Sequence, residues 1–164
     1  MNELNLPPFS VKTRGARPVS GAAATPAAAS RNAKLEIFDF LRKRYVTLTP
    51  EEWVRQHFTH WLVEHKGYPQ GLLANEIALH IGDKTLRCDS VVYDKTAHPL
   101  MIIEYKAPSV QITQRVFTQI SAYNLLLHVD YLVVSNGVQH YCLRMDYERA
   151  TYTFLPEVPD YKQI

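Results

Sequence analysis

The segment Leu-Met-Ile-Ile-Glu-Tyr-Lys-Ala, residues 100–107, constrains the fold most, because it is an apolar run that carries two charges. Its length and its β-branched content are typical of a buried β-strand. Residues two apart in a strand point to the same face, so Glu104 and Lys106 project together from one side of it. Buried charges are unfavourable unless other groups compensate them. The chain must therefore fold so that partners reach both side chains.

The periodicity of the flanking sequence predicts the order of elements around this strand. Thr49 is a helix N-cap, Pro50 stands at the first turn, and Glu52 is at the return position of a capping box. The predicted elements are a helix from Thr49 to about Lys66, strands at 72–81, 85–93 and 100–107 with a Gly82-Asp83 turn between the first two, a helix at 109–128, a strand at 131–135, a turn at Asn136-Gly137, and strands at 140–145 and 151–155. We expect an α/β (α+β) fold with a mixed central sheet flanked by helices and a C-terminal β extension.

The N-terminal part of the chain differs in composition from the rest. Residues 1–34 are predicted to be an arm whose Ala/Pro-rich part, 15–30, is a flexible linker, and residues 35–164 are predicted to be one domain. Residues 35–45 are predicted to form a short helix with Leu35, Phe38 and Leu41 on one face. The basic cluster 42–44 is interpreted as the solvated end of this helix. Phosphate contact is the alternative for the cluster, and also for Lys95 and Arg115.

Charge and hydropathy limit the partners and the compartment. A formal net charge of +2 excludes binding to phosphates by bulk charge alone, so any nucleic-acid contact requires a local patch. No run approaches the roughly 18 apolar residues that span a bilayer, and the N-terminus does not have the pattern of a secretory signal. We expect a soluble, cytoplasmic protein without a membrane partner. Cys88 and Cys142 are expected to be reduced thiols.

The charged strand also suggests chemistry. A hairpin of 85–93 and 100–107 centred between Thr96 and Ala97 places Asp89 opposite Glu104. Facing carboxylates, about 5 Å apart at Cβ, repel each other unless a proton or a cation intervenes. Two hard oxygen ligands completed by water and phosphate suit Mg²⁺, and Mn²⁺ is expected to substitute. With the Lys106 ammonium beside the ion, these groups form a hydrolytic site for phosphodiesters.

These residues resemble the PD-(D/E)xK nuclease superfamily, in which an Asp at the end of one core strand is followed by Glu-x-Lys on the next. Asp89 and Glu104-Tyr105-Lys106 match this pattern, although Cys88 stands in place of the proline. Gln119-Ile120-Ser121-Ala122-Tyr123 matches the Gln-x-x-x-Tyr motif of the branch related to RecB nucleases and type I restriction subunits. The phrases PEEWVRQ, CDSVVYD, IIEYKAP and VSNG resemble the N-terminal nuclease domain of type I restriction enzyme R subunits, over about residues 35–155.

The resemblance implies a restriction-endonuclease-like α-β-β-β-α-β core and a Mg²⁺-dependent DNA endonuclease. Asp89 and Glu104 would hold the metal, and Lys106 would assist the attacking water. Gln119 and Tyr123 would orient the scissile strand or the lysine. Many members add an acidic residue from the first helix, for which Glu51 is the choice. The alternatives that stay open are Glu52, explained by its capping box, and Glu76 on the first strand.

The resemblance also implies partners. DNA is the expected substrate. Because the chain has no GxxxxGK[ST] loop, we expect either a stand-alone nuclease domain or a subunit of a larger assembly that also contains motor or specificity subunits. Cutting both strands with one site per chain requires two copies or two visits, which leaves a homodimer open. The alternative function is a non-catalytic nucleic-acid-binding or assembly subunit that retains the nuclease fold.

Overall fold

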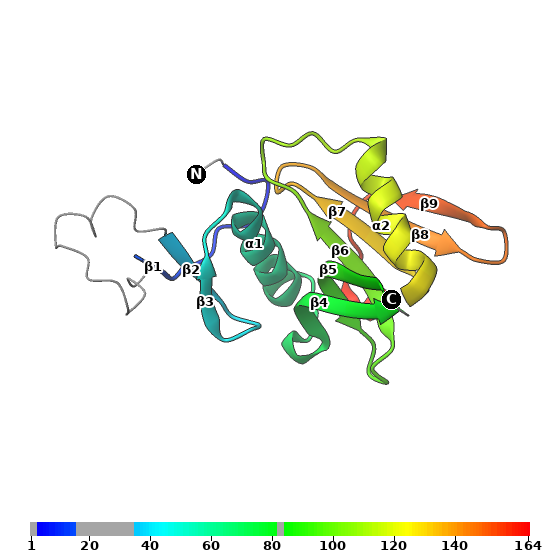
Figure 1. The fold of residues 1–164 in the computed structure, drawn as a ribbon, viewed down its shortest axis with the longest axis horizontal. Coiled ribbons are helices and arrows are strands. Elements are labelled where there is room, and N and C mark those ends of the chain that lie inside the picture. The colour runs from blue at the N-terminus through cyan, green and yellow to red at the C-terminus, as the bar shows by residue number, and fades with distance from the viewer. Residues whose placement is uncertain (1–2, 16–34, 82–83) are drawn as a thin grey trace.

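The computed structural model of the chain describes residues 3–15, 35–81 and 84–164, without the side chains at 79–81, 84, 86, 122–123 and 125–126 (Figure 1). Its elements are β1 (Thr13–Gly15), β2 (Leu35–Asp39), β3 (Arg44–Thr47), α1 (Pro50–His65), η1 (Gln70–Leu72), β4 (Leu73–Ile81), β5 (Lys84–Tyr93), β6 (Pro99–Tyr105), α2 (Gln114–Leu127), β7 (Tyr131–Ser135), β8 (His140–Asp146), β9 (Thr151–Leu155) and η2 (Tyr161–Gln163).

The described strands form two sheets. The larger has the order β4-β5-β6-β7-β8-β9, in which β6 and β7 are parallel and all other neighbours are antiparallel. Helix α2 makes the crossover between the parallel pair, as parallel neighbours require. From α1 to β7 the order is helix, three strands, helix, strand, which confirms the predicted core. Strands β8 and β9 extend the same sheet, so the predicted C-terminal β extension is also confirmed.

Alternate residues of the central strands pack against different helices. Phe58 of α1 belongs to a buried cluster with Met101 and Ile103 of β6. Ile120 of α2 belongs to a second cluster with Ile102 of the same strand. Because neighbouring residues of a strand point to opposite faces, the two helices cover opposite faces of the sheet. The predicted mixed sheet flanked by helices is therefore confirmed.

The prediction of a short helix over 35–45 is wrong. This segment forms the β2–β3 hairpin, and β1 pairs with β2 to complete a three-stranded sheet beside α1 (Figure 1). The alternation of Ile37 and Asp39, both buried, with more exposed neighbours is a strand pattern. Asp39 Oδ1 accepts hydrogen bonds from the backbone N–H groups of Leu41 and Arg42, each at 2.9 Å. These bonds close the turn and remove the backbone donors that a helix would use.

The start of one helix and the cap of the other differ from the predictions. Helix α1 begins at Pro50, and Thr49 Oγ1 accepts from the Glu52 N–H at 3.0 Å, as expected. The predicted capping box does not form, because the Glu52 carboxylate accepts from Arg42, Arg55 and Gln56 instead. Helix α2 begins at Gln114 rather than at residue 109. The predicted linker at 15–30 lies outside the described residues apart from Gly15 at the end of β1, and so does the Gly82-Asp83 turn.

The first described segment, 3–15, packs against the domain. The Asn5 N–H donates to the Gly137 carbonyl at 2.7 Å, and Leu4 and Leu6 contact the α1 side of the core. The predicted boundary between an arm and a domain at residue 34 stays a prediction. Cys88 and Cys142 are buried free thiols. Within the part of the chain that the structure describes, no helix is long and apolar enough to cross a membrane.

Candidate active site

The β5–β6 hairpin brings the two predicted acidic residues to the point where the strands separate. Ser90 pairs with Ile103 and Val91 with Ile102, which is the predicted register. Regular pairing ends there, one position before Asp89 and Glu104. At this position Asp89 Oδ2 accepts from the Tyr105 N–H at 2.8 Å, so a side chain takes the place of a strand carbonyl. This hydrogen bond holds Asp89 beside the end of β6.

Glu104 is the centre of the polar contacts at this end of β6. It is buried, and its Oε1 accepts from Lys106 Nζ at 2.7 Å and from Gln119 Nε2 at 2.9 Å. No donor among the described residues binds its Oε2. Burial and then the negative charge of Asp89 raise the pKa of Glu104, against the opposing effect of Lys106. A cation next to Glu104 and Asp89 would relieve this repulsion.

Lys106 lies directly after β6, and its backbone N–H continues the pairing with β7 by donating to the Ser135 carbonyl at 2.9 Å. Burial lowers the pKa of Lys106, but its hydrogen bond to Glu104 and the charges of Glu104, Asp89 and Glu51 outweigh burial and raise it. Lys106 therefore carries a full positive charge at neutral pH. It can stabilise negative charge on a phosphate or orient a water molecule.

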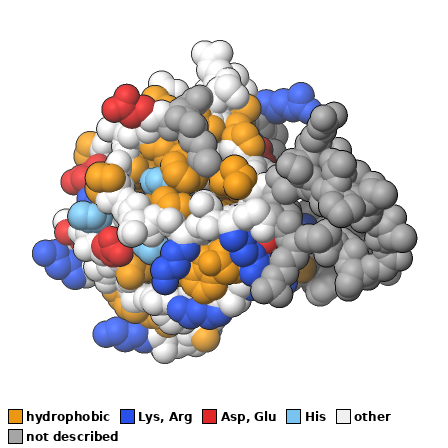
Figure 2. Space-filling view, turned by 90° about the vertical axis from the view of Figure 1, so that its left-hand side faces the viewer, with side chains coloured by type: hydrophobic (Ala, Val, Ile, Leu, Met, Phe, Trp, Pro, Cys, Tyr) orange, Lys and Arg blue, Asp and Glu red, His pale blue; other side chains and the backbone are white. Residues whose placement is uncertain are grey.

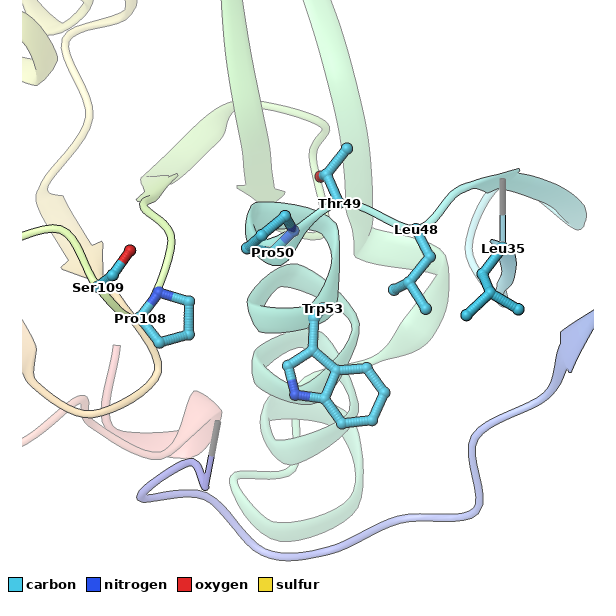
Figure 3. A pocket seen from close by; sticks show the side chains of 7 residues that line it. All are labelled: Leu35, Leu48, Thr49, Pro50, Trp53, Pro108 and Ser109. Carbon is cyan, nitrogen blue, oxygen red and sulfur yellow. The ribbon is translucent and has the colours of Figure 1, made fainter. Parts of the chain in front are cut away.

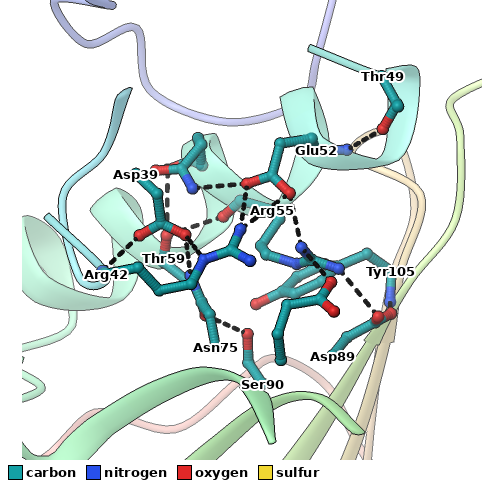
Figure 4. A network of polar contacts seen from close by, with 12 residues as sticks. Asp39, Arg42, Thr49, Glu52, Arg55, Thr59, Asn75, Asp89, Ser90 and Tyr105 are labelled. Carbon is teal, nitrogen blue, oxygen red and sulfur yellow. Dashed lines mark hydrogen bonds and ion pairs between the residues drawn. The ribbon is translucent and has the colours of Figure 1, made fainter. Parts of the chain in front are cut away.

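A buried arginine that the sequence analysis did not consider joins three elements at Asp89 (Figure 4). Arg55 of α1 contacts Glu52 at 2.6 Å, Glu76 of β4 at 2.6 Å and Asp89 of β5 at 2.9 Å. Burial opposes the charge of Arg55, but these three carboxylates raise its pKa, so it stays ionised. The spacing of Glu52 and Arg55 on one helix face was the available sequence signal. The contact with Asp89 depends on tertiary structure.

Glu76 adopts a backbone conformation that is unusual inside a strand. Its φ is +58°, and it lies between the regular pairs Asn75↔Ser90 and Ile77↔Cys88, at the position opposite Asp89. A left-handed conformation in a residue other than glycine is unfavourable by about 1–3 kcal/mol and is held by its surroundings. The surroundings here are ion pairs with Arg55 and Arg87. Glu76 thus supports Arg55 rather than facing solvent.

The remaining predicted site residues lie on the two helices. Glu51 is exposed in the first turn of α1, and its negative charge raises the pKa of both Glu104 and Lys106. Glu52 is turned to the arginines on the other side of the turn. The charge of Glu51 is therefore felt at the Glu104 cluster, and Glu52 is engaged in ion pairs with Arg42 and Arg55. Tyr123 lies on α2 one turn after Gln119, and its side chain lies outside the described part of the structure.

A pocket of about 400 Å³ lies between the first turn of α1, the start of the β2–β3 sheet and the loop after Lys106 (Figure 3). It is lined mainly by apolar side chains, from Leu35, Leu48, Thr49, Pro50, Trp53, Pro108 and Ser109. None of these is an acid, so Asp89 and Glu104 are not among the residues that line the pocket. The pocket joins the small sheet to the loop that follows the Glu104 cluster.

Comparison with known protein families shows to which family this chain belongs. The family described as "Type I restriction enzyme R protein N terminus (HSDR_N)" matches residues 50–159. The chain belongs to this family. The match of the R protein N-terminal family includes α1 and the whole six-stranded sheet, and with them Glu51, Asp89, Glu104, Lys106 and Gln119. The small sheet β1–β3 lies before the matched residues.

Other comparisons are distant. A comparison with curated proteins finds no match. Among solved structures, a fragment of a protein assigned as an HsdR subunit of a type I restriction enzyme from Vibrio vulnificus YJ016 is 19% identical, with a TM-score of 0.48. The alignment covers 68% of this chain and 24% of that one, so this member of the R protein N-terminal family corresponds to about a quarter of that protein's length. A likeness at this level carries no argument about activity.

Proposed function

We propose that the chain is a metal-dependent endonuclease that hydrolyses DNA phosphodiester bonds, with Asp89, Glu104 and Lys106 as its catalytic residues. The observation that carries the proposal is the contact of Lys106 and Gln119 with one oxygen of a buried Glu104, in the field of Asp89. Membership in the R protein N-terminal family of type I restriction enzymes supports it. DNA as substrate, and motor or specificity subunits as partners, belong to this proposal.

The donor set fits a Mg²⁺ site that is completed by water and substrate. In the described residues, no cluster of three or more His, Cys, Asp or Glu side chains could form a metal site. Asp89 and Glu104 supply two carboxylates, and Mg²⁺ commonly binds through one or two carboxylates with several waters and a phosphate. Asp89 and Glu104 would hold the ion, and Mn²⁺ would substitute for it. A bound ion would supply a Lewis acid that lowers the pKa of water and neutralises phosphate charge.

The chain's own residues have separate roles in the proposed reaction. Lys106, as an ammonium, would stabilise negative charge on the phosphate and orient the attacking water. Gln119 would fix the rotamer of Glu104 through its hydrogen bond to Oε1. Glu51, exposed at the start of α1, would accept a hydrogen bond from water on the solvent side. Tyr123 would act with Gln119 on the scissile strand.

One observation favours a second candidate, a non-catalytic DNA-binding or assembly subunit. Arg55 already donates to Asp89 Oδ1, and the Tyr105 N–H donates to Oδ2, so both oxygens of Asp89 have partners within the protein. A metal ion would have to share an oxygen with one of these donors. Carboxylate oxygens have two lone pairs each, so sharing is possible, but it weakens the interaction with the ion.

Cleavage assays separate the two candidates. Supercoiled plasmid and circular single-stranded DNA are incubated with the chain in Mg²⁺, Mn²⁺ or EDTA. We expect cleavage in either metal, none in EDTA, and a loss of at least about a hundredfold in Asp89→Asn, Glu104→Gln and Lys106→Ala. Glu148→Gln and Lys162→Ala, at exposed positions, are the matched controls and should cut normally. Cleavage by the three site variants at the normal rate would contradict the proposal, whereas DNA binding without cleavage would assign the second candidate.

A further inference from the structure

The outer face of the β1–β3 sheet carries two aromatic rings with cations stacked on them. Ile37 and Asp39 of β2 are buried, so Phe38 points to the opposite face, where it is paired in register with Tyr45 of β3. The two rings are 5.3 Å apart between centroids. The Arg14 guanidinium carbon lies 3.9 Å from the centroid of Tyr45, and Lys12 Nζ lies 5.9 Å from that of Phe38. Both distances are within the range of cation–π attraction.

This sheet is also the basic patch that the low net charge of the chain requires for any binding to phosphates. Its strands and turn, residues 12–15 and 35–47, carry five basic side chains and two carboxylates: Lys12, Arg14, Arg42, Lys43 and Arg44 against Glu36 and Asp39. Asp39 is buried against Arg42, and Glu36 pairs with Arg14 at 2.7 Å. Lys12, Lys43 and Arg44 are exposed. On the side of the molecule where this sheet lies, lysine and arginine side chains border an apolar area (Figure 2).

The sheet is connected to the proposed active site in two ways. Arg42 of the β2–β3 turn contacts Glu52, which contacts Arg55, and Arg55 contacts Asp89. In addition, Leu35 and Leu48 at the base of the sheet line the pocket that ends at Pro108, two residues after Lys106. A strand that lies along the sheet could therefore extend past the pocket to the Glu104 cluster.

We propose that the outer face of the β1–β3 sheet binds single-stranded DNA and delivers it to the active site. Bases stack on Phe38, Tyr45 and the outer side of the Arg14 guanidinium, and phosphates lie next to Lys12 and the basic turn. Sheets that bind single strands combine such aromatic platforms with flanking cations. A duplex keeps its bases stacked on each other, so the rings of this face would have no role in binding it. The proposal deepens the proposed function by naming the form of DNA that binds. Delivery of the DNA to the active site rests on the proposed function, whereas binding to the sheet does not.

The test measures binding separately from cleavage. Fluorescence anisotropy of a labelled thymidine oligonucleotide of about 20 nucleotides is recorded in EDTA with the full chain and with variants. We expect Lys12→Ala/Arg14→Ala to weaken binding at least about tenfold through the loss of one phosphate contact and one stacking surface. The slope of log K against log salt should fall by about 0.7, because Lys12 is the phosphate contact that is lost and each such contact contributes about 0.7 for a single strand. Tyr45→Leu, which keeps an apolar side chain, should weaken binding about tenfold through lost stacking.

The matched control removes two cations from the opposite end of the molecule. Arg144→Ala/Arg149→Ala on β8 and the following turn should change affinity less than twofold, and thermal unfolding should show that all variants are folded. The proposal would be overturned if the Lys12/Arg14 variant bound with the same affinity as the parent. It would also be overturned if the Arg144/Arg149 control lost as much affinity as the Lys12/Arg14 variant. A duplex of the same length that binds as tightly and with the same losses would overturn the assignment to a single strand. Binding is recorded in EDTA, where no cleavage is expected, so failure of cleavage and failure of this proposal are distinguishable.

Discussion

At the scale of single residues, Arg55 determines how Asp89 is held. Its side chain is 6% exposed, and its guanidinium contacts three carboxylates from three different elements. Removing one partner of a buried ionic network leaves the remaining charges uncompensated, which typically costs about 3–5 kcal/mol. We therefore expect Arg55→Met to lower the free energy of unfolding by about 4 kcal/mol, measured by urea denaturation.

Arg87→Met is the matched control, because Arg87 also pairs with Glu76 but its side chain is 69% exposed. An exposed ion pair contributes about 0–1 kcal/mol, so the control should be nearly as stable as the parent. If both variants lost the same stability, the buried position of Arg55 would not be the cause.

Sequence reasoning could propose Asp89, Glu104 and Lys106 because strand alternation places them. The i,i+3 spacing of Glu52 and Arg55 could have indicated the pair within the helix, but no local signal indicates the contact of Arg55 with Asp89, which is 34 residues away.

At the scale of elements, residues 35–45 show why a local pattern can mislead. Leu35, Phe38 and Leu41 have helical spacing, but Leu35, Ile37 and Asp39 also alternate as in a strand. For so short a segment, periodicity alone does not decide between helix and strand. The decision comes from pairing with β1, which is distant in sequence, and from the Asp39 carboxylate in the turn. In contrast, the helix start at Thr49-Pro50 and the long strands 73–81, 84–93 and 99–105 were predictable, because each has a strong local signal.

The β2–β3 turn gives a prediction at this scale. Asp39 accepts from two backbone N–H groups and contacts Arg42 and Asn75, and it is fully buried. We expect Asp39→Ala to lower the free energy of unfolding by about 3 kcal/mol. Amide hydrogen exchange should show that the amides of β1–β3 lose protection first, while those of the six-stranded sheet stay protected. Asp94→Ala is the control, because the Asp94 carboxylate also accepts from two backbone N–H groups in a turn but is exposed to solvent. A larger loss of stability in Asp94→Ala than in Asp39→Ala would contradict this explanation.

At the scale of the whole molecule, three partly or largely buried histidines anchor the N-terminal segment on the domain. The Phe9 ring stacks on His60 at 3.9 Å and meets the edge of His57 at 4.5 Å between centroids. His140 Nε2 contacts the Asn5 carbonyl at 3.0 Å, and its Nδ1 contacts Ser135 Oγ at 2.8 Å. Burial lowers the pKa of all three histidines, although Glu64 and Asp39 favour the charged form of His60. Burial therefore favours the neutral form of all three imidazoles in the folded chain, against the hydrogen bonds of His57 and His140 to backbone carbonyls.

The stability of the molecule should fall as the solution is acidified. A histidine whose pKa is lower in the folded than in the unfolded state binds more protons when unfolded, so stability decreases as the pH falls through about 6.5, the unfolded value. We expect Tm to be lower at pH 5.5 than at pH 7.5, by about 3 °C for each kcal/mol lost in a chain of this size. His140→Gln should reduce this dependence, because an amide can replace the hydrogen bond to Asn5 without titrating. His98→Gln, at a side chain that is 81% exposed, should keep the full dependence. A Tm that is constant between pH 7.5 and 5.5 would show that the N-terminal segment is not held by neutral histidines, and the N-terminal contacts with His57, His60 and His140 would then be incidental to stability.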